Sequence, residues 1–102
     1  MAAFPTAVDL DRTAQLLTID WDDGATTRYD GRTLRWGCPC AECRGEMDEP
    51  GRLDRTDSLP ADEERVRDVW LVGQYALGIS FESGHATGIY TFELLRRLGL
   101  RA

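Results

Sequence analysis

The cysteines constrain this chain more than any other feature, because all three lie within the hexapeptide Cys38-Pro-Cys-Ala-Glu-Cys43. Three thiols cannot all pair within one chain, so a complete disulfide framework is excluded. Close spacing lets a tight loop wrap several thiolates around one ion. Gly37 and Pro39 favour such a turn, since glycine permits a sharp entry and proline fixes φ. The cluster therefore predicts a metal site, and Zn²⁺ is the ion that suits it.

A tetrahedral zinc site needs a fourth ligand, and the chain contains a single histidine. His85 follows Ser83-Gly84 at an expected turn, from which its side chain can point inward. Cys38, Cys40, Cys43 and His85 then make a complete Cys₃His set for one Zn²⁺ per chain. Such a set leaves no position for a substrate or an activated water.

Other interpretations of the cysteines remain open. They could be inert buried thiols, or two of them could form a disulfide, which a reducing compartment disfavours. Cys40 and Cys43 also form a C-x-x-C pair, but the thioredoxin-like motif requires a βαβ unit, which the pattern lacks. The same four ligands could hold a two-iron, two-sulfide cluster. A cluster spreads its thiolates over a larger object, so three thiolates in six residues favour a single ion.

Charge and length narrow the class of protein. The chain has 102 residues and a net charge of −6, and all twelve basic residues are arginine. This charge disfavours nucleic acid and anionic membranes as partners. No apolar run approaches the roughly 20 residues of a membrane span, and residues 1–6 lack the features of a signal peptide. We therefore expect a cytoplasmic protein with a single domain.

The N-terminal half predicts one β-hairpin. Residues 1–14 show no periodicity, and we expect a flexible start. From Leu16, large side chains alternate through Leu17, Ile19 and Trp21, and residues 25–29 return as the second strand after the turn signal Asp23-Gly24. The domain is predicted to occupy residues 15–102.

Residues 44–65 carry eight acidic residues and four arginines, with few large apolar side chains. We expect a long solvated loop here, with a helical turn opening at Pro60.

The C-terminal half predicts a β-meander and a helix. Residues 66–72 favour a strand, residues 75–81 alternate large with small side chains, and a third strand starts at residues 85–89. Thr91 suits the start of a short helix that ends at Gly99, with Phe92, Leu95 and Leu98 on its apolar face. The predicted fold class is α+β: antiparallel hairpins, a zinc knuckle between them and a short C-terminal helix.

Residues 16–98 resemble the gamma-butyrobetaine hydroxylase-like N-terminal domain family. The matching motifs occur in this order: Ile19-Asp-Trp-Asp-Asp-Gly24, Leu34-Arg35, Cys38-Pro-Cys-Ala-Glu-Cys43, Val72-Gly-Gln-Tyr-Ala-Leu77 and Ser83-Gly-His-Ala-Thr-Gly-Ile-Tyr-Thr-Phe92. The resemblance implies a small β-rich domain whose cysteines and glycine-histidine element bind zinc, which again selects Cys38, Cys40, Cys43 and His85. In the hydroxylases such a domain precedes a 2-oxoglutarate- and Fe(II)-dependent catalytic domain, which this sequence does not contain. Some relatives are fused to ATPases that carry iron–sulfur clusters.

These observations predict a non-catalytic, zinc-binding module that binds a protein partner or a second copy of itself. The alternative is an accessory factor in iron–sulfur protein maturation, or a protein that binds an iron–sulfur cluster at the Cys₃His site. An enzyme that uses exposed thiols is disfavoured.

Three aromatic residues, Trp36, Tyr90 and Phe92, flank the predicted ligands along the chain. We expect them to gather at the metal end, where they either seal the site or leave an apolar patch exposed. Arg35, Arg96 and Arg97 would form the rim of such a patch.

Overall fold

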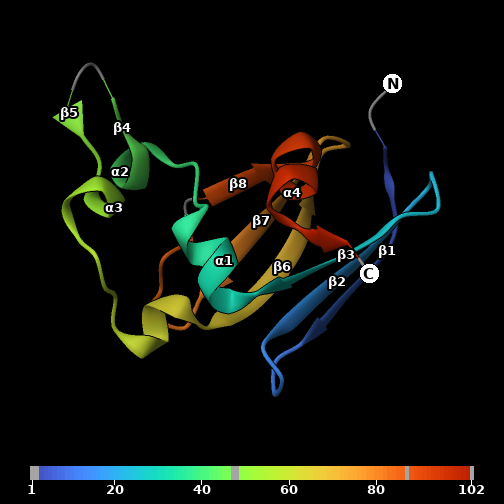
Figure 1. Cartoon of the computed structure of the whole chain (residues 1–102), viewed down its shortest axis with the longest axis horizontal. Helices are drawn as coiled ribbons and strands as arrows, with labels where there is room; N and C mark the ends of the chain where they lie inside the picture. Colours follow the sequence, from blue (N-terminus) through green and yellow to red (C-terminus); the bar gives the residue numbers. More distant parts are fainter. Residues whose placement is uncertain (1–2, 47–48, 87, 102) are drawn as a thin grey trace.

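The computed structural model of the chain describes residues 3–46, 49–86 and 88–101 (Figure 1). Over these residues the chain has the predicted α+β fold, built on two main antiparallel sheets. No helix in the described ranges is long and apolar enough to cross a membrane. The larger sheet has the order β1-β2-β3-β9 and consists of β1 (Pro5–Asp11), β2 (Leu16–Trp21), β3 (Thr26–Asp30) and β9 (Leu100–Arg101).

The first hairpin forms as predicted. β2 pairs with β3 in an antiparallel register that places Leu16 opposite Asp30. Leu17, Ile19 and Trp21 are all buried, as their alternation indicated. The turn between the strands contains Gly24 at φ +89°, a conformation that glycine adopts at little cost.

The prediction of a flexible N-terminus was wrong for Pro5–Asp11, which form β1 on the free edge of β2. Six of the seven side chains in β1 lie at least partly exposed, so no alternation of buried residues marks the strand in the sequence. Backbone pairing with β2 holds it in place, which requires no particular side chain. Residues 1–2 lie outside the described part of the chain.

The predicted meander forms the second sheet, in the order β6-β7-β8. Its strands are β6 (Val66–Val72), β7 (Ala76–Phe81) and β8 (Gly88–Thr91). Leu77, Ile79 and Phe81 are buried, and the Trp70 ring lies so close to Gly78 that a Cβ there would approach its Cε2 to 2.3 Å. Both faces of β7 are therefore covered. Tyr75, which we expected within this strand, instead lies exposed in the turn before it.

Helix α1 (Gly31–Trp36) leads from β3 to the candidate site, and α4 (Phe92–Leu98) connects β8 to β9. Asp30 caps α1 by accepting a hydrogen bond of 2.6 Å from the Thr33 backbone N–H, which holds the pKa of that carboxyl below its usual range. Thr91 caps α4 as predicted, since its Oγ1 accepts from the Leu94 N–H at 3.1 Å. After α4, β9 returns to pair with β3 and adds a strand that the sequence did not indicate.

The acidic segment expected to be a loop folds into short elements instead. These follow one another as α2 (Ala41–Arg44), β4 (Gly45–Glu46), β5 (Glu49–Pro50), α3 (Arg52–Arg55) and the 3₁₀ turn η1 (Ala61–Glu64). The helical turn predicted at Pro60 is confirmed by η1, whereas the rest differs because Leu53 is buried in the core cluster and anchors the segment. Met47 and Asp48 lie outside the described residues. Figure 1 shows α2, β4, β5 and α3 at the end of the molecule far from the β1-β2-β3 sheet.

One hydrophobic cluster joins both sheets, α1, α4 and the cysteine loop. Leu17 and Ile19 enter it from the larger sheet, Ile79 and Phe81 from the smaller one. Cys38 and Cys43 belong to the same cluster, so the candidate metal site adjoins the core rather than lying on the surface.

Candidate metal centre

The cysteine loop is shaped by the ends of two short helices. The backbone N–H of Cys38 donates to the Arg35 carbonyl at 3.2 Å, just after α1 ends. The N–H of Cys43 then donates to the Cys40 carbonyl at 3.1 Å, which turns the chain back on itself. Arg44 fixes the loop from outside, since its Nε donates to the Cys38 carbonyl at 2.8 Å and its Nη2 to the Trp36 carbonyl. All three thiols therefore face one point.

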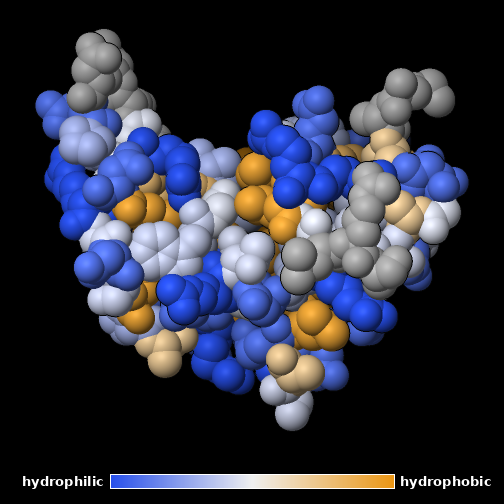
Figure 2. Space-filling model, in the orientation of Figure 1, coloured by the Kyte–Doolittle hydropathy of each residue, from blue (hydrophilic) through white to orange (hydrophobic). Residues whose placement is uncertain are grey.

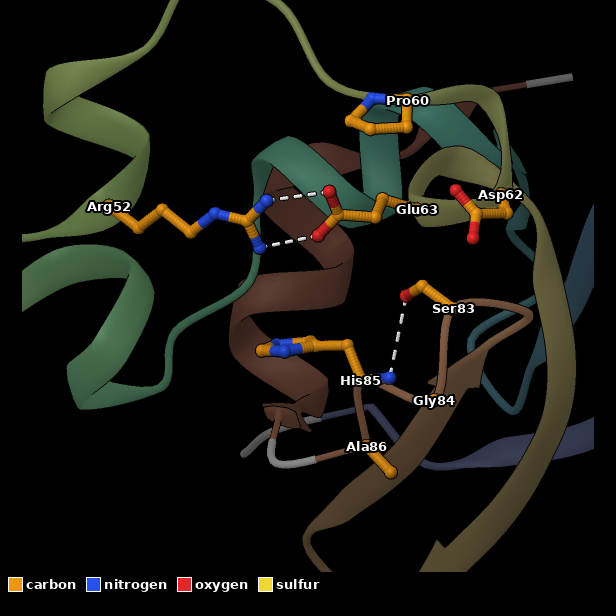
Figure 3. Close-up of a pocket in the computed structure, with 8 residues that line it drawn as sticks. All are labelled: Arg52, Pro60, Asp62, Glu63, Ser83, Gly84, His85 and Ala86. Carbon is orange, nitrogen blue, oxygen red and sulfur yellow. Dashed lines mark hydrogen bonds and ion pairs between the residues drawn. The ribbon is translucent and has the colours of Figure 1, made fainter.

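His85 reaches that point from the second sheet. The turn after β7 closes with the Gly84 N–H donating to the Phe81 carbonyl at 2.9 Å, and the Phe81 N–H donates to the His85 carbonyl at 2.9 Å. The backbone N–H of His85 also lies 3.5 Å from Ser83 Oγ, which accepts from it (Figure 3). This turn was predicted from the Ser-Gly-His pattern, and it carries the imidazole across to the cysteines.

The four predicted ligands converge, with their ligand atoms all within 4.8 Å of one another. His85 Nε2 lies 3.4 Å from Cys38 Sγ, 3.7 Å from Cys40 Sγ and 3.6 Å from Cys43 Sγ. Cys38 Sγ and Cys40 Sγ are 3.5 Å apart. Zinc bonds of about 2.3 Å to sulfur and about 2.0 Å to nitrogen place tetrahedral ligand atoms roughly 3.5 to 3.8 Å apart. The group could hold a single metal ion, and both its donor atoms and its spacing fit zinc.

The inner side of the site is buried in the protein, and its outer side is accessible to solvent. Cys38 and Cys43 are fully buried, whereas Cys40 and His85 are half-buried. Gly88 allows this packing, because a Cβ there would lie 2.8 Å from Cys38 Sγ and equally close to the Tyr90 ring. On the outer side, His85 lines a cleft of about 510 Å³ together with Arg52 and Glu63 (Figure 3).

Burial controls the ionisation of the thiols. It raises the pKa of Cys38 to about 12 and also raises the pKa of Cys43, although the Arg35 guanidinium opposes the second shift. A bound cation reverses this balance, because a coordinated thiol loses its proton. The pKa of the neighbouring Tyr90 hydroxyl is raised as well, chiefly by burial, and that hydroxyl donates to the Leu34 carbonyl at 2.6 Å.

Arg35 is the residue beside the site whose role the sequence did not reveal. We expected it at an exposed rim, and that was wrong: its side chain is fully buried, and its Nη1 donates to Cys43 Sγ at 3.1 Å. Its Nη2 lies 3.6 Å from Glu63 Oε1, and its guanidinium carbon lies 5.7 Å from the Phe81 ring centroid. Burial by itself lowers the pKa of this guanidinium, but Cys43, Cys38 and Glu63 raise the pKa on balance, so the charge is retained.

Among the described residues, two nitrogens of Arg35, Nε and Nη2, have no hydrogen-bond acceptor. Glu63, the nearest carboxylate, is shared, because Arg52 binds both of its oxygens through Nη1 and Nη2. The only signal that could have indicated this arrangement is the position of Arg35 one short turn before Cys38. A helix of six residues is too brief for periodicity to show which side chain faces inward.

The three aromatic residues expected at the metal end divide between two places. Tyr90 lies beside Cys38, and Trp36 is half-buried with its Nε1–H donating to Glu64 Oε2 at 2.7 Å. Phe92 instead packs edge-on against Phe4 and Trp21, at centroid distances of 5.4 and 5.9 Å. The prediction was wrong for Phe92, because the chain turns into α4 at Thr91 and directs this side chain toward the larger sheet.

The predicted rim of three arginines does not form. Arg96 lies over Trp21 at 5.1 Å from the ring centroid, and its Nη1 forms an ion pair of 3.0 Å with Asp23. Arg97 alone of the three predicted residues lines a groove near the cysteine loop, where Arg44 joins it.

The chain belongs to the gamma-butyrobetaine hydroxylase-like N-terminal family, whose model matches residues 8–96. A similar solved structure is the crystal structure of a protein of unknown function from Acidithiobacillus ferrooxidans, which belongs to the DUF971 family. It is 34% identical, with a TM-score of 0.69, over 92% of this chain and 90% of that chain.

Two proteins solved by NMR in solution are also similar, each 26% identical, with TM-scores of 0.72 and 0.70. The first match covers 96% of this chain and 73% of that chain, and the second covers 95% and 69%. No curated protein sequence matches the chain. The family assignment agrees with the resemblance found in the sequence motifs.

Proposed function

We propose that this protein is a zinc-binding, non-catalytic accessory module, held in shape by one Zn²⁺ on Cys38, Cys40, Cys43 and His85. The observation that carries the proposal is the position of His85 Nε2, which lies 3.4 to 3.7 Å from all three sulfurs. The segment between β7 and β8 brings this histidine to nearly equal distances from the three thiols of the cysteine loop. This is the arrangement of a closed, four-coordinate structural site. Such a site fits a reducing compartment, and we place the protein in the cytoplasm.

The same distances favour one ion over a two-iron cluster. In a cluster the protein ligands divide between two irons, so a histidine on one iron would lie far from the thiolates on the other. His85 Nε2 lies at nearly equal distances from the three sulfurs, so these ligands do not separate into two groups. An iron–sulfur role, in cluster binding or in maturation of other proteins, is therefore the second candidate, and the metal assay below separates it from the first.

An accessory module needs a surface for a partner, and the groove beside the cysteine loop offers one. The groove has a volume of about 470 Å³, with Trp36, Ile89, Leu94 and Leu98 as its large apolar lining and Arg44 and Arg97 at its basic side. Figure 2 shows apolar side chains gathered over α4 and β8, bordered by hydrophilic ones. Exposed apolar surface of this kind favours a protein partner, a second copy of the chain among them.

The test is metal analysis and an absorption spectrum of the protein purified in air. We expect one zinc per chain and no visible absorption. Lowering the pH should release the zinc together with the tertiary signal, because protons compete for the thiolates and the imidazole. Visible charge-transfer bands with bound iron and sulfide would favour the second candidate. A protein that binds neither zinc nor iron would overturn both.

A further inference from the structure

A fully buried arginine is costly unless negative charge lies next to it. Among the described residues, Arg35 donates one hydrogen bond, to Cys43 Sγ, and has one carboxylate beside it, that of Glu63 at 3.6 Å. That carboxylate is already held through both oxygens by Arg52. Glu63 therefore compensates the buried charge of Arg35 only in part, because it lies 3.6 Å from Arg35 Nη2 and accepts no hydrogen bond from that nitrogen.

The metal centre supplies the missing charge. Three thiolates around a divalent ion, with a neutral imidazole, leave one negative charge on the complex. Metal binding strips the thiol protons, so this negative charge appears only when the ion is bound. That negative charge lies directly against the buried guanidinium, whose Nη1 donates to Cys43 Sγ at 3.1 Å. The guanidinium N–H also donates more strongly to a thiolate than to a neutral thiol, because the thiolate carries a full charge of opposite sign.

We propose that Arg35 is the internal counter-ion of the metal centre, so that the bound ion and the buried arginine stabilise each other. This inference rests on the proposed function and adds to it a positioning residue that binds no metal itself. Arg35 acts through Cys43: its N–H withdraws charge from that sulfur and orients the side chain toward the ion.

Glu63 and Arg52 extend the arrangement to the acidic segment. Figure 3 shows their ion pair in the cleft that His85 also lines. Because Glu63 lies on η1 and Arg52 on α3, a metal that fixes Arg35 also holds these two elements against the site. Removal of the ion would leave Arg35 with Glu63 as its nearest carboxylate among the described residues, at 3.6 Å.

The experiment compares Arg35→Met with the wild-type protein, both loaded with Co²⁺ in place of Zn²⁺. Methionine keeps an unbranched apolar chain, shorter than that of arginine, and removes the charge and the N–H donors. The matched control is Arg96→Met, which breaks a different arginine contact, with Trp21 and Asp23, and touches none of the four ligands. Affinity is measured by competition with a chelator, and the thiolate-to-cobalt charge-transfer band is recorded in the same samples.

We expect Arg35→Met to bind Co²⁺ about 10- to 100-fold more weakly, the usual cost of losing an outer-shell partner of a metal ligand. Its charge-transfer band should move to longer wavelength, because a thiolate that accepts no N–H bond is a better electron donor. Arg96→Met should keep the wild-type affinity and band. An unshifted band with wild-type affinity in Arg35→Met, or an equal change in both variants, overturns the inference.

Two further measurements keep the test decisive. If Arg35→Met does not fold, Glu63→Gln replaces it. The charge of Arg35 then has only the thiolates to balance it, and the thiolate-to-cobalt band should move to shorter wavelength than in the wild-type protein. A band that stays in place or moves the other way contradicts the counter-ion role. Failure of the wild-type protein to bind Zn²⁺ or Co²⁺ at all would refute the proposed function itself. Normal binding by the wild-type protein, with the same affinity and the same band in Arg35→Met, refutes only this inference.

Discussion

The β1-β2-β3 hairpin sheet and the cysteine end of the molecule are stabilised by different forces. In the sheet, Leu17, Ile19 and Trp21 alternate inward and are almost completely buried. In residues 41–65, Leu53 and Cys43 are the buried hydrophobic side chains among those described, Leu59 is partly buried, and most of the other residues are polar or charged. The sheet is held mainly by apolar burial, whereas the cysteine end has fewer buried apolar side chains and contains the candidate metal site and the Arg35–Glu63–Arg52 ion pairs.

The comparison shows how a chain of 102 residues can keep a charged segment ordered. A small domain buries too little apolar surface to fix every part of itself, and a metal site is a common supplement. Here the cysteine loop and the turn at His85 come from segments more than 40 residues apart, and an ion at their meeting point would join them. The two ends should therefore respond differently to the same perturbation.

The largest effect is expected from His85→Ala, which should lose the metal. Structural zinc contributes on the order of 10 kcal/mol in small folding-coupled sites, enough to unfold the segments that the site joins. Hydrogen exchange should show lost protection in α2, α3 and η1, with more protection kept in β2 and β3. Stripping wild-type protein with a chelator should reproduce this pattern, and adding zinc back should reverse it. Equal loss of protection at both ends would show that the two regions do not differ.

The next effect concerns the sheet, where Leu17→Ala should cost about 2–5 kcal/mol by leaving a cavity. Chemical denaturation measures this cost, and metal content measured alongside should stay at the wild-type value. A variant that also loses its metal would mean that the core and the cysteine end are one cooperative unit. Val8→Ala, a change at an exposed position of β1, is the control and should alter stability little.

A smaller effect is expected from pH, through Glu63. Its hydrogen bonds from Arg52 hold the pKa of this carboxyl below the usual range against the opposing effect of burial. A folded-state pKa below the unfolded value of about 4.3 stabilises the fold above that pH, and the contribution disappears as the pH falls through the folded value.

Wild-type protein should therefore lose stability below about pH 5 more steeply than Glu63→Gln, which carries no titrating group at this position. At neutral pH the variant should be less stable by about 1–3 kcal/mol, because a buried charged partner loses its acceptor. Denaturation curves are compared only over the pH range in which the cobalt spectrum shows that both proteins keep their metal, which separates this effect from metal release. Parallel pH profiles for the two proteins would contradict the role given to Glu63.

The smallest effect is expected at Trp36, which lies at the border between the two regions. Trp36→Phe removes the N–H that donates to Glu64 and should cost about 1 kcal/mol while the metal is retained. Sedimentation of the same variant, and of Trp36→Ala, measures self-association separately. Weaker association at near-normal stability would assign Trp36 to a contact between copies. Lost stability with unchanged association would assign it to the packing between α1 and η1.

The sequence by itself determined the features that depend on neighbouring residues. Alternation through Leu17, Ile19 and Trp21 predicted the first hairpin, because a period of two requires only local backbone geometry. Thr91 predicted the start of α4 for a similar reason, since a cap is a contact between residues three apart. The convergence of the three cysteines with His85 was also predictable, because the chain offers one histidine for the vacant fourth position.

Tertiary structure alone decided what depends on contacts between distant segments. β1 was missed because backbone pairing with β2 leaves no pattern in its exposed side chains. Phe92 was placed at the wrong end because α4 turns it toward Trp21, a residue 71 positions earlier in the chain. Arg35 was expected at the surface, since arginine is seldom fully buried. Only the packing of Cys43, Glu63 and Phe81 around it shows that a sulfur, a carboxylate and an aromatic ring surround this guanidinium inside the fold.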